Sequence, residues 1–147
     1  MYQYAEQLMD LIEKSPSRYH ATANLKNRLT AEGYTALAED AAWDVRPGGR
    51  YVVTRNDSSL LAFRVPEGGV TGFALAAAHS DSPTFQIKEH AEKLSARCTV
   101  LDTEKYGGML MNTWFDRPLS VAGRIIVERD GTLEARLADV WQSLISF

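Results

Sequence analysis

The chain has 147 residues, 45% of them hydrophobic and 24% charged, which is ample for one ordinary globular domain and too short for two large ones. Its 16 Lys and Arg against 19 Asp and Glu give a net charge of -3, so no charge pattern predicts a nucleic acid or an anionic membrane as partner. The single cysteine, Cys98, excludes an internal disulfide and fits a reducing compartment, which predicts a cytoplasmic protein.

The amino-terminal region is expected to be helical. Apolar residues recur at helical spacing from Tyr4 to Ile12, and a second helix is expected from about residue 17 to residue 32, with Gly33 as its C-terminal stop. Acidic residues interrupt the first apolar pattern, so we do not expect a secretory signal. No window approaches the roughly 18 uninterrupted apolar residues of a membrane-spanning helix.

After Gly33 the chain changes to short β-rich runs separated by turn residues. The expected strands are RYVVTR (50–55), SLLAFRV (59–65), GFALAAAH (72–79), TFQIKEH (84–90) and GRIIVER (123–129). The segments NDSS at 56–59 and RDGT at 129–132 have the composition of hairpin turns. Two helices followed by closely spaced strands predict an α/β fold with a mixed β-sheet.

The apolar run GFALAAAH ends on His79, and Asp81 follows two residues later. In an extended strand these two side chains point to the same side and Ser80 points away. The spacing suits a metal site, in which an imidazole binds the ion and a carboxylate orients the ring. On spacing alone, a hydrogen-bonded structural histidine is the commoner case. A Ser/His/Asp hydrolase is disfavoured, because adjacent residues cannot converge in the required relay and no G-x-S-x-G elbow is present.

Four motifs occur in order and with natural spacing from about residue 4 to Asp139: SPSRYHATAN, AAWDVRPGGRYVVTRNDSSLLAFRVP, AAHSDSP and YGGMLMNTWFDRPLSVAGRIIVERDG. Together they resemble the M18 aminopeptidases, the aspartyl aminopeptidase family of zinc metallopeptidases. The resemblance implies a hydrolase with two zinc ions that removes N-terminal residues, in some members acidic ones, from peptide substrates. It also implies a homo-oligomer with no nucleic-acid or membrane partner.

The resemblance assigns roles to particular residues. His79 matches the first zinc ligand, and Asp81 matches a catalytic carboxylate that supports the metal centre. His20 matches a family position and is a candidate substrate-binding residue; a helix-start histidine with a local partner is the alternative. Asp116 and Arg117 match a motif of the inserted segment that mediates subunit pairing, and an ion pair within this loop is favoured over direct catalysis.

The resemblance further implies that residues 1–91 form the amino-terminal part of a catalytic domain and that residues 92–147 begin an inserted β-rich dimerisation domain. The family's other zinc ligands, its bridging Asp and its general-base Glu come from later in a longer chain. We therefore expect an incomplete zinc site that is inactive alone. The change from RLADV to WQSLISF is interpreted as a truncation or frameshift, and open strand edges predict poor solubility or association.

Two other functions are compatible with the sequence. One is a non-enzymatic assembly module, in which residues 92–147 pair with an intact homologous subunit. The other is a single-zinc hydrolase assembled across a homodimer, which would require His20 or His90 of a partner to approach His79; nothing in the spacing supports it. His90 and Cys98 match no motif.

Overall fold

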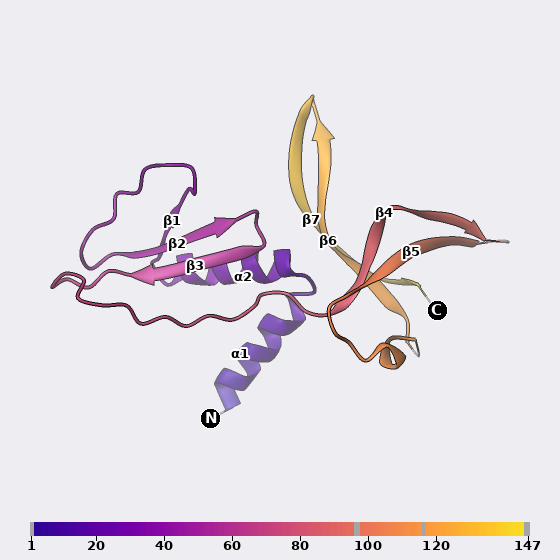
Figure 1. Ribbon diagram of the computed structural model, residues 1–147, viewed down its shortest axis with the longest axis horizontal. Helices are drawn as coiled ribbons and strands as arrows, with labels where there is room; N and C mark the ends of the chain where they lie inside the picture. The colour runs from indigo at the N-terminus through magenta and orange to yellow at the C-terminus, as the bar shows by residue number, and fades with distance from the viewer. Residues whose placement is uncertain (1, 96–97, 116, 146–147) are drawn as a thin grey trace. The chain divides into compact units, whose positions relative to one another are not determined.

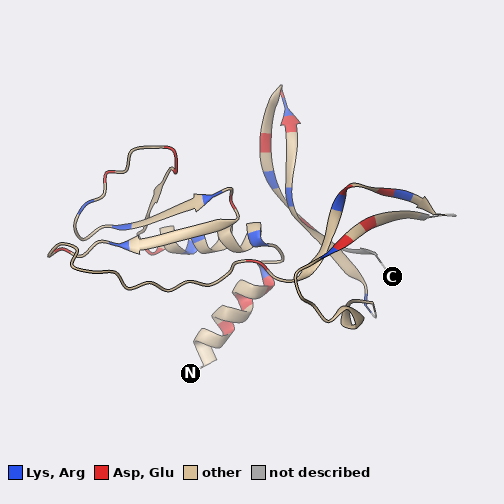
Figure 2. Cartoon of the chain, viewed as in Figure 1, with Lys and Arg blue, Asp and Glu red and all other residues tan. Residues whose placement is uncertain are grey.

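The computed structural model describes residues 2–95, 98–115 and 117–145 (Figure 1). The chain divides into two compact units. The first comprises Met1–Asp81 and Val121–Trp141, and the second comprises Ser82–Ser120 and Gln142–Phe147. The charged residues of the helix at residues 2–13 are all acidic and those of the helix at residues 18–31 are all basic, whereas the hairpins carry both kinds (Figure 2).

Two helices open the first unit, α1 (Tyr2–Glu13) and α2 (Arg18–Ala31). Ser17 is the N-cap of α2, and its side chain accepts a hydrogen bond from a backbone N–H of the first turn. Gly33 has a φ of 85°, and the N–H groups of Gly33 and Tyr34 donate to carbonyls of the last turn. This is the Schellman arrangement, in which a glycine adopts the left-handed conformation cheaply. The predicted end of the second helix is confirmed.

A three-stranded sheet follows, made of β1 (Thr35–Leu37), β2 (Arg50–Arg55) and β3 (Ser59–Arg64). The central strand β2 pairs parallel with β1 and antiparallel with β3, so the sheet is mixed as predicted. Asn56 and Asp57 join β2 to β3 with φ values of 50° and 54°, which short polar side chains tolerate best. The strand β1 was not predicted, because three residues carry no readable periodicity.

The core of this unit lies between β2 and α2. Val52 is completely buried, and Thr22 of α2 is 2% exposed. Aromatic rings pack on one another on the other face of β2: the ring centroids of Tyr51 and Phe63 lie 5.3 Å apart, and those of Trp43 and Phe63 lie 6.1 Å apart. The Thr22 hydroxyl is buried without a hydrogen-bond partner among the described residues, a condition that costs about 1–3 kcal/mol.

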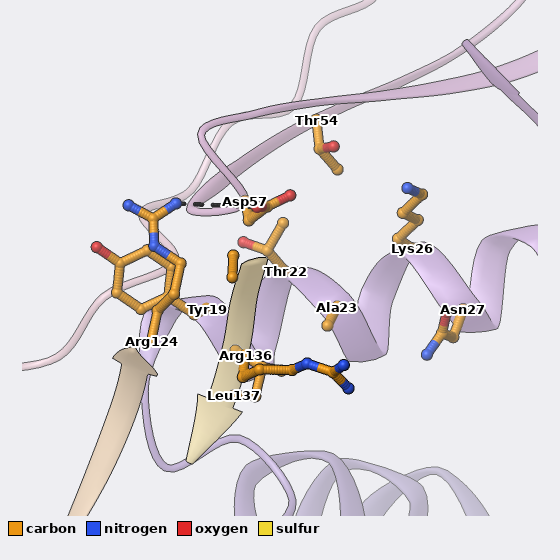
Figure 3. Close-up of a pocket in the computed structure, with 11 residues that line it drawn as sticks. Tyr19, Thr22, Ala23, Lys26, Asn27, Thr54, Asp57, Arg124, Arg136 and Leu137 are labelled. Atoms are coloured by element: carbon orange, nitrogen blue, oxygen red, sulfur yellow. Dashed lines mark ion pairs between the residues drawn. The ribbon is translucent and has the colours of Figure 1, made fainter. Parts of the chain in front are cut away.

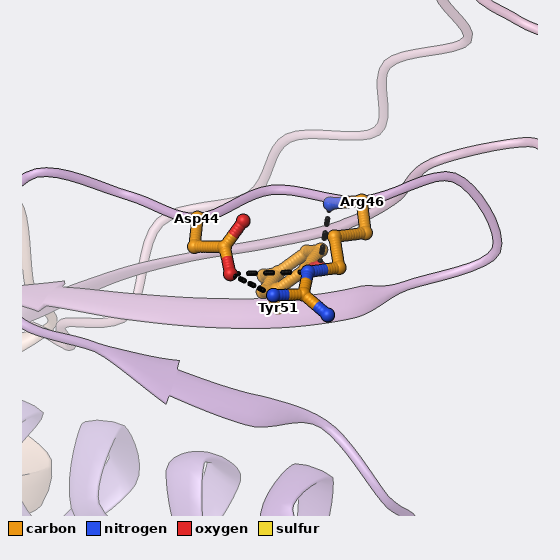
Figure 4. Close-up of polar contacts among 3 residues, drawn as sticks. All are labelled: Asp44, Arg46 and Tyr51. Atoms are coloured by element: carbon orange, nitrogen blue, oxygen red, sulfur yellow. Dashed lines mark hydrogen bonds and ion pairs between the residues drawn. The ribbon is translucent and has the colours of Figure 1, made fainter.

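The connection before β2 is held by polar contacts to Tyr51 (Figure 4). The Arg46 backbone N–H donates to the Tyr51 hydroxyl at 2.9 Å, and the Arg46 guanidinium donates to the Asp44 carboxylate at 3.0 and 2.5 Å. The hydrogen bond to Asp44 raises the pKa of Arg46 above its ordinary value. These contacts fix the irregular connection before β2 against the buried side chain of Tyr51.

The strand predicted over residues 72–79 is absent, which corrects the sequence interpretation. Residues 72–83 have no regular secondary structure, and Phe73 and Leu75 are 87% and 89% exposed. A charge-free apolar run indicates a strand that is buried on both faces. Such a strand needs neighbours on either side, and none of the strands resolved in the described ranges pairs with this segment. The run is therefore an exposed apolar connection between β3 and the next strand.

The second unit contains the antiparallel pair β4 (Thr84–Ser95) and β5 (Cys98–Tyr106). The register shifts between Ile87 and Glu92 of β4, so four β4 residues lie outside the regular ladder. The predicted strand at 84–90 is confirmed and is longer than expected. The strand β5 was not predicted.

Ion pairs join the two strands, and an aromatic contact joins β4 to a short helix. Asp102 of β5 forms ion pairs with Lys93 at 2.6 Å and Lys88 at 3.3 Å. The hydrogen bond from Lys93, and then that from Lys88, lower the pKa of Asp102. Phe85 packs edge-on against Trp114 of the short 3-10 helix η1 (Met111–Trp114), with ring centroids 5.7 Å apart.

The last two strands are β6 (Leu119–Arg129) and β7 (Thr132–Ile145), which form a two-stranded sheet. Asp130 and Gly131 connect them with φ values of 52° and 76°, as the RDGT turn predicted. The strand predicted at 123–129 is confirmed, and β7 was not predicted. Within the described ranges, neither helix has the length and apolar character needed to cross a membrane.

Candidate metal centre

His79 and Asp81 lie in the irregular connection between β3 and β4. The intervening Ser80 donates a hydrogen bond from its hydroxyl to the Ser58 carbonyl at 2.9 Å, in the turn between β2 and β3. The side chain of His79 is 81% exposed, and that of Asp81 is 34% exposed. Ser80 thus anchors the segment to the sheet while the histidine is presented to solvent.

The two candidate residues contact each other directly. Nδ1 of His79 lies 2.8 Å from the backbone carbonyl oxygen of Asp81 and 3.0 Å from its carboxylate Oδ1. A carbonyl oxygen only accepts hydrogen bonds, so Nδ1 carries the proton and donates. In the neutral ring the lone pair is then on Nε2, the nitrogen that faces away from Asp81. A histidine oriented through Nδ1 by a carboxylate or carbonyl is the usual form of a metal-binding imidazole.

The donor set is incomplete for a zinc ion. Within the described ranges, no three His, Cys, Asp or Glu side chains come together in a group that could hold a metal. A catalytic zinc takes about three protein ligands and a water molecule. The chemistry of the His79–Asp81 pair fits one imidazole ligand with its supporting carboxylate, and the described part of the chain places no further ligand group beside it.

His20 is placed in a different environment. It lies in the first turn of α2, where its Nδ1 is 2.8 Å from the Ser17 hydroxyl oxygen and its backbone N–H donates to the same oxygen at 3.4 Å. The local partner expected of a helix-start histidine is therefore present. A substrate contact by His20 stays a prediction.

The remaining candidates receive less support. His90 lies in the irregular part of β4, in the second unit. Asp116 lies outside the described residues, so its expected ion pair with Arg117 stays a prediction. The division of the chain at residue 91 also stays a prediction.

Sequence reasoning missed two contacts of the site. These are the backbone carbonyl of Asp81, which receives the His79 proton, and the Ser58 carbonyl, which anchors Ser80. Main-chain carbonyls carry no sequence signal, since every residue has one. The strand-like alternation that predicted the orientation of His79 and Asp81 also does not apply in an irregular segment.

Known proteins of similar sequence cover nearly the whole chain. The family described as "Aminopeptidase I zinc metalloprotease (M18)" matches residues 11–146, past residue 139, where the resemblance was expected to stop. A probable M18 family aminopeptidase 2 of Clostridium acetobutylicum is 41% identical over 97% of this chain and 34% of its own length. One of Pseudomonas aeruginosa is 47% identical over 90% of this chain and 31% of its own length. The chain thus spans about a third of the length of these curated relatives.

Solved structures agree with the sequence match. A chain in the cryo-EM structure of the Ape4 and Nbr1 complex superposes with a TM-score of 0.91 at 37% identity, covering 95% of this chain and 28% of that one. Chaetomium thermophilum mApe1 superposes with a TM-score of 0.84 at 33% identity, covering 93% of this chain and 32% of that one. A chain of the S. cerevisiae mApe1 dodecamer superposes with a TM-score of 0.81 at 26% identity, covering 95% of this chain and 34% of that one. The family match, the curated relatives and these structures together show that the chain belongs to the M18 family of zinc metallo-aminopeptidases.

Proposed function

We propose that this chain is the amino-terminal part of a zinc-dependent aminopeptidase that hydrolyses N-terminal residues, acidic ones among them, from peptides, and that it is inactive alone. The observation that carries the proposal is the Nδ1–H hydrogen bonding of His79 to Asp81, which leaves Nε2 with a lone pair for a metal. The single Cys98 supports a reducing, cytoplasmic location.

The residues of this chain have defined parts in that activity. His79 would hold zinc through Nε2, and Asp81 would keep the ring in the required tautomer and orientation. When bound, zinc polarises a scissile carbonyl and lowers the pKa of a water molecule to about 7. Asp81 acts as a positioning residue, since its carboxylate contacts the imidazole of His79.

The exposed apolar residues before His79 support the proposal that further polypeptide completes the fold of this chain. Phe73 and Leu75 are 87% and 89% exposed, and full burial of such side chains stabilises a protein by about 1.5–3 kcal/mol each. The additional two thirds found in the relatives would supply strands and side chains to cover this run. Burial of the run would also hold His79 at a fixed position for the remaining ligands.

The test compares this chain with a chimera that joins it to the rest of the Clostridium acetobutylicum relative. Both are assayed for release of N-terminal Asp, Glu and Leu from peptide substrates, with and without added zinc. The chain alone should show no turnover because it lacks ligands, and the chimera should be active and inhibited by a chelator. His79→Ala should abolish activity of the chimera, whereas the matched change His90→Ala should leave most of it. Zinc-dependent turnover by the chain alone, or an active His79→Ala chimera, would contradict the proposal.

A second candidate function is a non-enzymatic assembly module for an intact homologous subunit. The observation in its favour is the two-stranded sheet of β4 and β5, in which Leu94 is 94% exposed and Val100 is 44% exposed. An unpaired sheet edge with apolar side chains is a template for another chain. This function predicts co-purification with the tagged full-length Clostridium relative in the presence of chelator, and loss of that complex in Leu94→Glu. Absence of a complex from the wild-type chain would exclude it.

A further inference from the structure

A cavity of about 290 Å³ lies in the first unit (Figure 3). It is bordered by α2, the end of β2, the turn after β2, and strands β6 and β7. Three cationic side chains line it, Lys26, Arg124 and Arg136, against one carboxylate, Asp57. The guanidinium of Arg136 is paired with the Glu134 carboxylate at 2.5 Å, so the side chains at the cavity remain positive by one, although the whole chain has a net charge of -3.

Arg124 is held in place at one end of the cavity. Its guanidinium carbon lies 4.6 Å from the centroid of the Tyr19 ring, and its Nη1 donates to the Asn56 carbonyl at 2.9 Å. The same group lies 3.8 Å from the Asp57 carboxylate, at the outer limit of an ion pair. Figure 3 shows the guanidinium stacked over Tyr19. A guanidinium fixed on an aromatic face keeps further N–H groups for a ligand.

Two other lining groups have unused hydrogen-bonding capacity. Thr22 is 2% exposed, and its hydroxyl has no hydrogen-bond partner in the described part of the chain. Lys26, one turn further along α2, is half-buried and forms no ion pair within the described ranges. Buried hydroxyls are normally hydrogen-bonded, so the Thr22 hydroxyl indicates a missing hydrogen-bond partner. Lys26 adds a positive charge that no carboxylate of the described ranges neutralises, which favours a negatively charged partner.

We propose that this cavity binds a phosphate group, either as inorganic phosphate or as part of a phosphorylated small molecule. A phosphate has several acceptor oxygens and about two negative charges, which match a guanidinium, an ammonium group and a hydroxyl donor. A monocarboxylate has one charge and two oxygens and leaves part of this donor set unused. The site is independent of the proposed peptidase chemistry, because no candidate residue of the metal centre lines the cavity.

The test is calorimetric titration of the 147-residue chain at low ionic strength with inorganic phosphate, phenyl phosphate and acetate. Phosphate is expected to bind with a Kd of about 1 mM, and acetate about tenfold more weakly or not at all. Tighter binding of phenyl phosphate identifies a phosphorylated small molecule as the ligand, and equal binding identifies free phosphate. Shifts of the Tyr19 and Lys26 amide resonances should locate the site in the cavity.

Two variants and a control separate binding from folding. Lys26→Met keeps most of the length of the side chain, removes its charge and should weaken phosphate binding about tenfold. Thr22→Val removes only the hydroxyl, so it should weaken phosphate while leaving the unfolding midpoint unchanged or higher. Lys14→Met, which removes an exposed ion pair with Asp10, should bind phosphate as the wild type does.

Four results would overturn the proposal. They are no saturable phosphate binding, equal affinity for phosphate and acetate, wild-type affinity in Lys26→Met, and wild-type affinity in Thr22→Val. A Thr22→Val chain that is less stable but binds phosphate normally would show that the hydroxyl serves the packing of α2.

Discussion

Gly49 should be among the positions of the first unit that are least tolerant of a side chain. An added Cβ would lie 2.5 Å from Cε2 and 2.6 Å from Cζ of Tyr51, both closer than real Cβ contacts. Tyr51 is 6% exposed and packs on Phe63, so its ring has no free space to enter. The Gly49 backbone is also fixed, because its carbonyl accepts a hydrogen bond from the Val65 N–H at 2.9 Å. Either the ring or the connection must move in Gly49→Ala.

The expected loss of stability follows from the contacts that the displaced Tyr51 ring loses. Overpacking of a buried site costs about 1–3 kcal/mol, and displacement also removes the Arg46–Tyr51 hydrogen bond and the Tyr51–Phe63 ring contact, each worth about 1 kcal/mol. With partial relaxation, we expect Gly49→Ala to lower the free energy of unfolding by about 2–3 kcal/mol and the melting temperature by about 6–10 °C. Urea unfolding followed by near-ultraviolet circular dichroism reports the loss.

Gly68→Ala is the matched control. No atom lies within 4 Å of a Cβ at Gly68, so this change should alter the free energy of unfolding by less than about 0.5 kcal/mol. The double variant Gly49→Ala/Tyr51→Leu, which removes the aromatic ring, should be less destabilised than the sum of its two single changes. If Gly49→Ala were as stable as Gly68→Ala, the packing of Tyr51 against the connection would be refuted.

Three further changes test other parts of the structure. Lys93 and Lys88 lower the pKa of Asp102, so its ion pairs stabilise the fold above about pH 4 and are lost as the pH falls through the lowered pKa. The urea midpoints of the wild type and Asp102→Asn should therefore differ at pH 7 and converge in acid; a difference that persists in acid would contradict the assignment. Ser17→Ala removes the N-cap of α2 and should cost about 1 kcal/mol, measured by urea unfolding at the helical circular dichroism signal, whereas Ser17→Gly should cost only a few tenths. Phe73→Ser should change the stability of this exposed site by less than about 0.5 kcal/mol in the 147-residue chain but by about 2 kcal/mol in the chimera; equal effects would contradict burial of the run by the added polypeptide.

The sequence predicted the elements whose signals are local. Gly33 ends α2 through its own left-handed conformation, and Asn56 and Asp57 shape the turn between β2 and β3. The prediction of a strand at residues 72–79 was wrong. An apolar composition favours a strand only where neighbouring strands cover it, and the segment alone does not show whether such strands are present. The strand β5 was missed because alternation of polar and apolar residues is weak in CTVLDTEKY and its pairing with β4 is tertiary.

In the candidate site, too, local contacts could be predicted from the sequence and tertiary contacts could not. The pairing of His79 with Asp81 was predicted from spacing and is present in the structure, although the strand geometry used to predict it is not. The cavity beside Thr22 could not be predicted, because it joins residues of α2 to Arg124 and Arg136 more than 90 positions later. Such a juxtaposition depends on the packing of β6 and β7 and leaves no periodic signal.

The three-residue turn after β2 connects otherwise separate parts of the first unit. The Ser58 carbonyl accepts a hydrogen bond from the Ser80 hydroxyl, between His79 and Asp81, and the Asn56 carbonyl accepts one from Arg124 of the cavity. Both anchors are main-chain atoms, so substitutions in the turn would be tolerated as long as its backbone path is kept. An insertion of one residue, by contrast, would move both carbonyls at once and shift the histidine and the arginine together. The turn therefore works as a spacer whose length, more than its composition, is constrained.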